Sequence, residues 1–397
     1  MNRHPLYAQR YRYALIVNLI LPLAGMSTDI YLPSLPAMTQ HFCTASSLVQ
    51  LTVSAFVIAL GFGQFISGPL SDALGRKRLI IGSLWTQLFA IIGILLVPNI
   101  IMVMILRFIQ GLAAAFMNVP ARAMLNDLFS GEALRKQFNL VTIIYAVSPI
   151  IAPFIGGLLQ HHLFWQANFM LLFCYATGLL IVFQIYFHDT IVDKQDFSIA
   201  RLWQNYRTIL SHRHFVACTL MASFFWGFGA IFSSIGPFLV QVGLGYSADA
   251  YGVMALLIGL AWFVGTSVSR LLFKIAIPLK MPITLTLMLL TAAVFFAISR
   301  SEHFTIYQLV IPTFVLVCLS GFSFPIFVGE CMVLFREIAG SANACLFGMI
   351  WLGFSGFTLI AATLKTHSLR PLGTTYLILA AAMCVWYAFG VHRKVKA

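Results

Sequence analysis

Long apolar runs separated by short polar stretches dominate the chain. A run of about 20 apolar residues is long enough to cross the hydrocarbon core of a bilayer as a helix. Twelve such runs lie near residues 13–34, 47–70, 79–97, 100–125, 137–160, 166–188, 214–240, 249–273, 280–298, 305–329, 341–364 and 371–391. Only Pro98 and Asn99 separate the third run from the fourth, which indicates a tight turn. The pattern predicts an all-α membrane protein with twelve transmembrane helices.

The basic residues alternate between the two sides of these predicted spans. Most of the 24 lysines and arginines fall in the terminal segments and in every second loop, as in the run Arg76-Lys77-Arg78. The opposite loops contain only Arg300, Lys365 and Arg370. Because cytoplasmic loops of membrane proteins carry an excess of basic residues, both termini are expected in the cytoplasm. An eleven-span or thirteen-span interpretation would break this alternation.

Composition excludes a soluble protein. The chain is 60% hydrophobic and 9% charged, whereas soluble domains carry roughly 25% charged residues. The net charge of +13 reflects loop charges rather than binding to nucleic acid. The first apolar run is too long for the core of a signal peptide. Seven scattered cysteines without a CxxC motif indicate neither a disulfide framework nor a metal site, so no cofactor is expected.

The longest polar interval, near 188–214, divides the chain into two groups of six spans. It predicts an N-terminal bundle over 1–188, a cytoplasmic linker over 189–213 and a C-terminal bundle over 214–397. Within the linker, Trp203 to Leu210 is amphipathic, which is typical of an interfacial helix.

The loop after the second run has a distinctive spacing of glycine, acid and base. Gly75 can adopt a positive φ without penalty, so a helix can end there. The matching positions are Gly68, Asp72, Gly75, Arg76 and Lys77. This spacing resembles the signature loop of the major facilitator superfamily. The resemblance implies two pseudo-symmetric six-helix bundles. It also implies that Asp72, Arg76 and Asp127 form a charge cluster that latches the cytoplasmic ends of the two halves.

Two ionisable residues lie inside predicted spans of the first half. Asp29 is near the outer end of the first span, and Arg107 is about seven residues into the fourth. At 1.5 Å of rise per residue, their depths are roughly 8 and 10 Å, so the two residues are level. A charge in a span is costly unless it is paired or wet. The two residues form either a structural ion pair or a site where Asp29 exchanges a proton while Arg107 tunes its pKa.

Three stretches are similar to motifs of the drug:proton antiporters in the bicyclomycin and chloramphenicol resistance branch. They are 27–36 around Asp29, 106–111 around Arg107, and 148–157 in the fifth span. The resemblance implies proton coupling by Asp29 and Arg107. The third stretch is similar to the antiporter motif, and its motif residues are Pro149, Ala152, Pro153, Gly156 and Gly157, with Ala152 in place of a glycine.

Other polar and aromatic residues are weaker candidates. Possible cavity-lining residues are Tyr31, Gln110, Tyr145, Phe225 and Trp226. For Phe225 and Trp226, packing against lipid is an equally good interpretation. Glu330 is expected as a water-exposed carboxylate at a helix end. His41, His161 and His162 are expected on outer loops without a specific role.

No P-loop, nucleophile elbow or metal motif is present, which argues against ATP-driven transport and catalysis. We expect a proton-coupled secondary transporter that exports small amphipathic molecules or drugs by alternating access. Its partners would be a small-molecule substrate, protons and the lipid bilayer, without nucleic acid. A monomer in the bacterial inner membrane is expected. The alternative is a dedicated exporter of an endogenous metabolite such as a siderophore. A non-transporting membrane receptor or a passive channel is a more remote alternative.

Overall fold

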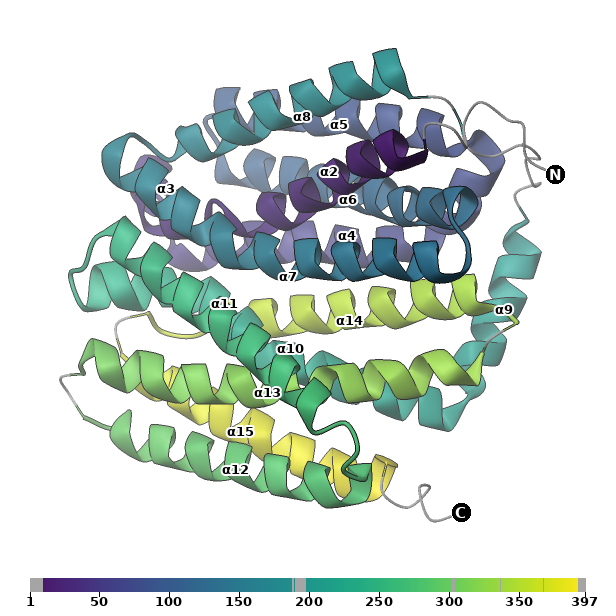
Figure 1. Ribbon diagram of the computed structural model, residues 1–397. Helices are drawn as coiled ribbons and strands as arrows, with labels where there is room; N and C mark the ends of the chain where they lie inside the picture. The colour runs from purple at the N-terminus through teal and green to yellow at the C-terminus, as the bar shows by residue number, and fades with distance from the viewer. Residues whose placement is uncertain are drawn as a thin grey trace.

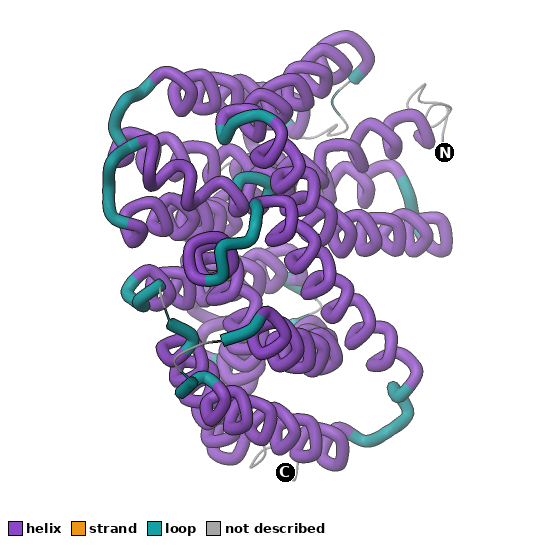
Figure 2. Tube along the Cα trace, turned by 90° about the vertical axis from the view of Figure 1, so that its left-hand side faces the viewer, coloured by secondary structure: helices purple, strands orange, loops and turns teal. Residues whose placement is uncertain are grey.

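The computed structural model describes residues 10–187, 189, 198–301, 304–335, 337–366 and 368–391. The side chains of residues 142, 145, 146, 201 and 391 are not described. Within these ranges the regular structure is helical, without a strand (Figures 1 and 2).

The first half of the chain contains the first six predicted spans. Its helices are α2 (Arg10–Asp29), the 3-10 helix η1 (Leu32–Ser34), α3 (Leu35–His41), α4 (Ser46–Leu74), α5 (Arg76–Leu96), α6 (Ile100–Leu128), α7 (Gly131–His162) and α8 (Gln166–Tyr186). The first predicted span differs from expectation in one respect. Its α-helix ends at Asp29, and the chain continues through a turn into η1 and α3. Pro33 and Pro36 lack the N–H that an uninterrupted helix would use at those positions, which fits the break.

The second half repeats the arrangement after a short helix. Its helices are α9 (Ile199–Ser211), α10 (Arg213–Phe238), the π-helical turn η2 (Leu239–Gly243), α11 (Ala248–Leu271), α12 (Ile277–Ile298), α13 (Ile306–Leu334), α14 (Ala339–Ala362), α15 (Arg370–Trp386) and the π-helical turn η3 (Tyr387–Val391). Among the described residues, 11 helical segments are long and apolar enough to cross a membrane. The 32-residue α7 is long enough to be the twelfth span. The prediction of a twelve-helix membrane fold is confirmed.

The two halves lie one above the other in Figure 1, and two helix pairs hold them together. Helix α4 packs along α14, and α7 packs along α11. We call the end of the molecule that carries the chain termini and α9 the termini end, and the opposite end the far end (Figure 1). Figure 2 views the molecule from the far end.

Helix α9 covers the amphipathic stretch predicted in the linker, and it contacts both halves. The Tyr206 hydroxyl donates a hydrogen bond to the Phe65 carbonyl of α4 at 2.5 Å. The Asn205 side chain donates to the Ser341 hydroxyl of α14 at 3.2 Å. Burial raises the pKa of the Tyr206 phenol, so its hydroxyl remains a donor. Trp203 is exposed on the outer face of the helix, as an interfacial helix requires.

Both predicted turns form. Helix α4 ends at Gly75, whose φ of 96° is the left-handed conformation that glycine adopts without strain. Between α5 and α6, the Asn99 side chain accepts a hydrogen bond from the Ile101 N–H at 2.8 Å and caps α6.

Candidate functional site

Asp29 is the last residue of α2, directly before the break in the first span. A helix end within a bilayer leaves backbone groups without intrahelical partners, so it must lie against protein or in a polar site. Asp29 is half-buried, and its neighbours Thr28 and Ile30 are buried. The carboxylate therefore sits at an irregular point of the backbone rather than inside a continuous helix.

Arg107 reaches this segment from α6 and is fully buried. Its Nη1 donates hydrogen bonds to the Ser27 carbonyl at 2.8 Å and to Gln110 Oε1 at 2.9 Å. Ser27 also accepts a hydrogen bond from Gln87 Nε2 of α5 at 2.8 Å. These bonds attach the Arg107 guanidinium to Ser27, which lies two residues before Asp29 in the sequence. Within the described residues, no ion pair of 4.0 Å or less joins Arg107 to Asp29.

Two aromatic rings enclose the guanidinium in place of a carboxylate. The carbon of the Arg107 guanidinium lies 4.3 Å from the ring centre of Tyr31 and 4.3 Å from that of Phe56. The Tyr31 hydroxyl lies 3.0 Å from the Thr52 hydroxyl, which fixes the first ring. Desolvated cation–π contacts are worth about 2 kcal/mol. Nε and Nη2 of Arg107 are also buried, so the whole guanidinium is shielded from solvent.

We expect Arg107→Lys to lower the initial rate of uphill transport at least about tenfold. Lysine keeps the charge but loses the planar guanidinium face that contacts the Tyr31 and Phe56 rings. The measurement is transport by equal amounts of reconstituted protein. Arg122→Lys is the matched control, because Arg122 lies on the same helix and its side chain bonds Gln64 Oε1 at 3.2 Å. A near-normal rate for Arg107→Lys would show that charge alone matters.

The predicted antiporter motif lies on α7, where it contacts both α2 and the second half. The Ser148 hydroxyl donates to the Pro22 carbonyl at 3.1 Å. A Cβ added to Gly156 would lie 1.7 Å from the Ile30 carbonyl oxygen, directly after Asp29. A Cβ on Gly157 would lie 2.6 Å from the Ala248 carbonyl oxygen of α11. The two adjacent glycines therefore let the α7 backbone contact the Ile30 segment on one side and α11 on the other. Pro149 and the buried Ala152 and Pro153 belong to the same helix, and the Pro153 carbonyl faces Gly252 of α11.

Polar contacts between the halves gather at the far end. Gln50 Oε1 accepts from the Ser234 hydroxyl at 3.0 Å, and the Gln241 side chain donates to the Pro33 carbonyl at 2.8 Å. The hydroxyls of Ser54 and Thr358 lie 2.8 Å apart. Together with the glycine contacts of α7, these bonds close the far end.

The expectation of a loop position for His161 is wrong. His161 is in the last turn of α7, and its Nδ1 lies 3.4 Å from Asp249 Oδ1 at the start of α11. This pair joins the two halves at the far end. Spacing along the chain gave no sign of it, because the residues are far apart in sequence and both are ordinary at helix ends.

We expect Asp249→Asn to loosen this closure. The amide keeps the size of the carboxylate but removes the negative charge that faces His161. A partly exposed pair of this kind is worth roughly 0–1 kcal/mol, so the closed population should fall by up to about fivefold. Distances between spin labels at Thr44 and Tyr246 report the closure. Unchanged distances in Asp249→Asn would show that this pair does not hold the far end closed.

The signature loop forms the predicted charge cluster. Arg76 Nε lies 2.5 Å from Asp127 Oδ2, and Arg76 Nη2 lies 3.5 Å from Asp72 Oδ1. The Arg76 backbone N–H donates to Asp189 Oδ1 at 3.1 Å. Lys77 Nζ lies 3.5 Å from the Gln184 carbonyl oxygen.

The partners of Arg76 named above come from α4, α6 and Asp189, the first residue of the predicted linker. The cluster thus joins α4, α5 and α6 to the start of the linker, and a latch between the two halves stays a prediction. At Gly68 an added Cβ would meet nothing within 4 Å, so close packing does not explain that glycine.

We expect Asp127→Asn to destabilise the protein more than Asp72→Asn. The Arg76–Asp127 contact is shorter, and the Asp127 side chain is 23% exposed against 40% for Asp72. A partly buried pair with one partner removed costs more than an exposed one. We expect a loss of about 1–3 kcal/mol for Asp127→Asn and below about 1 kcal/mol for Asp72→Asn. Unfolding of the purified variants in one detergent gives the comparison, and the reverse order would contradict it.

The other candidate residues occupy different parts of the molecule. Tyr31 and Gln110 both belong to the Arg107 site. Tyr145 lies on α7, but its side chain is outside the described residues. Phe225 is fully buried against Phe327, so it is packed within the second half and does not face lipid.

Trp226 is at the centre of an aromatic cluster in the second half. Its ring centre lies 4.6 Å from that of Trp262, 5.9 Å from Phe324, 6.0 Å from Trp351 and 5.8 Å from Phe354. These rings come from α11, α13 and α14, so Trp226 also faces protein.

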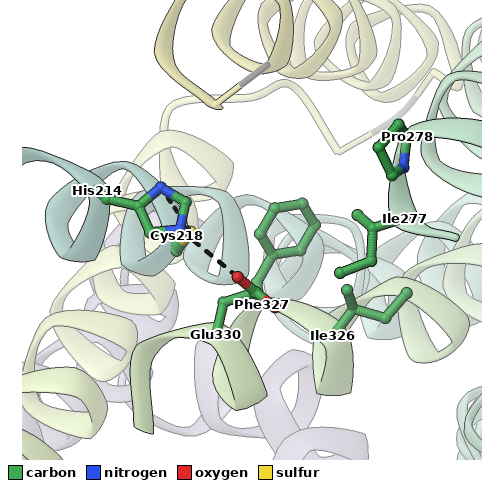
Figure 3. A pocket seen from close by; sticks show the side chains of 7 residues that line it. All are labelled: His214, Cys218, Ile277, Pro278, Ile326, Phe327 and Glu330. Carbon is green, nitrogen blue, oxygen red and sulfur yellow. Dashed lines mark hydrogen bonds and ion pairs between the residues drawn. The ribbon is translucent and has the colours of Figure 1, made fainter. Parts of the chain in front are cut away.

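Glu330 lines a separate cavity at the termini end of the second half (Figure 3). The cavity has a volume of about 180 Å³ and lies between α10, α12 and α13. Glu330 Oε2 lies 3.6 Å from His214 Nε2. The facing wall of the cavity is apolar and includes Ile277 and Pro278 (Figure 3). The Glu330 side chain is 44% exposed, as expected near a helix end.

Twelve long helices in two packed halves define a multi-pass membrane protein, and the family match makes it a transporter rather than an enzyme. The chain belongs to the Major Facilitator Superfamily, whose sequence pattern matches residues 18–358. The family predicted from the signature loop is therefore confirmed.

Relatives and solved structures agree with this assignment. The chain is 28% identical over 363 residues to the uncharacterised MFS-type transporter YdgK of Bacillus subtilis (strain 168), covering 88% of each chain. It is 31% identical over 170 residues to a chloramphenicol resistance protein of Pseudomonas aeruginosa, covering 42% of this chain and 41% of that one. A bacterial homolog of the human lysosomal transporter Spinster, solved in an inward-facing and unoccupied conformation, shares the fold with a TM-score of 0.78. Its identity is 12%, over 100% of this chain and 99% of that chain.

Proposed function

We propose that the protein exports small amphipathic molecules, drugs among them, in exchange for protons. The observation that carries this function is the isolated Asp29 carboxylate at the break in the first span, next to the buried Arg107. The similarity to a chloramphenicol resistance protein supports a drug as substrate.

Protonation of Asp29 changes the charge of the site. With a proton on the carboxyl group, the guanidinium leaves a net charge of +1, and without it the charges of the pair cancel. A net charge inside a bilayer is costly. The charged, protonated site therefore favours contact with water, and the neutral, deprotonated site tolerates an enclosed position. A transporter that alternates between two open states can couple this difference to the movement of a substrate.

The basic loops support a cytoplasmic termini end. The closed far end then faces outward, as in an inward-facing state, and the protein works as a monomer in the bacterial inner membrane. In this state a cytoplasmic molecule approaches from the termini end, and a proton leaves Asp29 towards the cytoplasm.

The test is accumulation of a panel of labelled drugs, including chloramphenicol, in an efflux-deficient bacterium that expresses the protein. At least one compound should accumulate less than in cells with the empty vector, and an uncoupler should restore its level. Lower accumulation that the uncoupler leaves unchanged would exclude proton coupling. Equal accumulation of the whole panel, with the protein shown in the membrane, would exclude drug export.

A further inference from the structure

The few basic residues of the loops at the far end come from neighbouring segments of the second half. Arg300 follows α12, Lys365 lies between α14 and α15, and Arg370 is the first residue of α15. Helices α12 and α15 pack along each other (Figure 1), and Ser299, directly before Arg300, packs against Gly373 of α15. Because the loops at this end contain no other lysine or arginine, their meeting at one corner of the molecule requires an explanation.

Lys365 and Arg370 line an open cavity of about 400 Å³ at this corner. Three hydroxyl groups line it as well, those of Ser368, Thr374 and Thr375, and none of its lining residues is acidic. The Ser368 hydroxyl accepts a hydrogen bond from the Arg370 backbone N–H at 3.2 Å, which fixes the turn before α15. Both cationic side chains are exposed, and among the described residues no carboxylate lies within 4.0 Å of either. The cavity therefore suits an anion.

Exposed apolar side chains continue from this cavity along α15 and its neighbour α12. Arg370, Thr374 and Ile378 are spaced four residues apart and share one face of α15, and Ile378 is 64% exposed. On α12, Leu290 and Val294 are also four residues apart, with exposures of 58% and 56%. In a membrane, such side chains contact the hydrocarbon of the lipids. At 1.5 Å of rise per residue, Ile378 lies about 12 Å along the helix from Arg370, so a molecule whose anionic group binds Arg370 can reach Ile378 with an apolar tail.

We propose that the cavity beside Lys365 and Arg370 binds the phosphate of an anionic phospholipid in the leaflet at the far end. The Arg370 guanidinium presents paired N–H donors that match phosphate oxygens, and Lys365 adds a compact positive charge. Basic pockets between membrane helices bind lipid head groups in this way. The acyl chains of the lipid lie along the exposed faces of α12 and α15. A free phosphate ion would use the same two cations but would leave these apolar faces without a role.

The test is binding of phosphatidylglycerol with a fluorescent acyl chain to the purified full-length protein in a non-ionic detergent. Unlabelled phosphatidylglycerol should displace this probe, and phosphatidylcholine, whose net charge is zero, should displace it at least about fivefold less well. Inorganic phosphate in large excess should not displace it. Near a membrane surface each basic residue strengthens binding of an anionic lipid about fivefold. Lys365→Gln combined with Arg370→Gln should therefore weaken probe binding roughly 25-fold, whereas Arg370→Lys, which keeps the charge, should remain within about threefold of the native protein.

Arg270→Gln combined with Lys274→Gln is the matched control, because these two exposed cations lie at the end of α11, on the opposite side of the membrane. The control removes the same charge and should leave probe binding within about twofold. Thermal unfolding without added lipid shows that each variant is folded, and the single variants Lys365→Gln and Arg370→Gln, at about fivefold each, replace a double variant that is not. An equal loss in the control would overturn the inference in favour of general charge attraction. Displacement by inorganic phosphate would overturn it in favour of a free anion.

Lipid binding in detergent needs neither a transported substrate nor a proton gradient, so its outcome is separate from that of the efflux assay. Proton-dependent efflux together with equal probe binding by the native protein and the double variant would reject only the lipid site. The expected binding pattern without efflux would reject only the export function.

Discussion

Asp29→Asn is expected to abolish proton-driven efflux while substrate exchange without a gradient continues. Asparagine has nearly the same size and shape as aspartate, so the break after α2 and the buried Arg107 should remain in place. It cannot take up or release a proton, and the site then keeps one charge in both states of the cycle. The measurement is uptake of a labelled substrate into proteoliposomes with and without an imposed pH gradient. The gradient should accelerate the native protein at least about 100-fold more than the variant.

Counterflow of labelled against unlabelled substrate is the control, because it needs binding and alternation but no net proton movement. We expect Asp29→Asn to retain it within about threefold. Gradient-driven accumulation by this variant would show that another group couples the proton. Loss of both activities, with a correctly folded protein, would indicate that Asp29 binds the substrate itself.

Gly156→Ala is expected to abolish transport and to destabilise the protein by more than about 3 kcal/mol. The added Cβ would lie 1.7 Å from the Ile30 carbonyl oxygen and 2.7 Å from its carbon. Both atoms belong to the backbone, so α7 or the segment after Asp29 must move. Overpacking of this kind typically costs 1–3 kcal/mol where side chains can adjust, and a backbone obstacle costs more.

Gly178→Ala on α8 provides the comparison, since an added Cβ there meets nothing within 4 Å. Alanine favours a helix over glycine by about 1 kcal/mol, so that variant should be at least as stable as the native protein. Thermal unfolding in detergent and transport in proteoliposomes are measured for both. Normal stability and transport in Gly156→Ala would mean that α7 and the Ile30 segment do not approach so closely.

Apolar run length and loop charge were sufficient to predict the helical fold. Bilayer thickness alone sets the length of a span at about 20 apolar residues. A single sequence is therefore enough to locate the spans. The break at Asp29 was less accessible. Pro33 and Pro36 indicate irregular backbone near 33–36, but the helix already ends four residues before Pro33.

The surroundings of Arg107 were predicted only in part. Its approach to the first span follows from helix geometry, and Gln110 lies one turn away on the same helix. The ring of Phe56 comes from α4, and no spacing rule connects it to Arg107. Such contacts depend on helix rotation, which packing between helices determines. Whether the Arg76 cluster joins the two halves was open for a related reason: a charge pattern gives the sign of a partner but not the bundle to which it belongs.

The adjacent glycines Gly156 and Gly157 of α7 bear on how well a proton exchanger avoids leaking protons. An exchanger in which the proton site and the outer gate moved independently would leak protons whenever one moved alone, and the membrane potential would be dissipated. Gly156 rests on the backbone beside Asp29, and Gly157 rests on the backbone of the opposite half. A single rigid helix therefore contacts both at successive residues. A shift of the second half at Ala248 would then reach the Ile30 segment without any flexible side chain in between. In the proposed exchange, the missing Cβ atoms of the two glycines would keep proton leakage low.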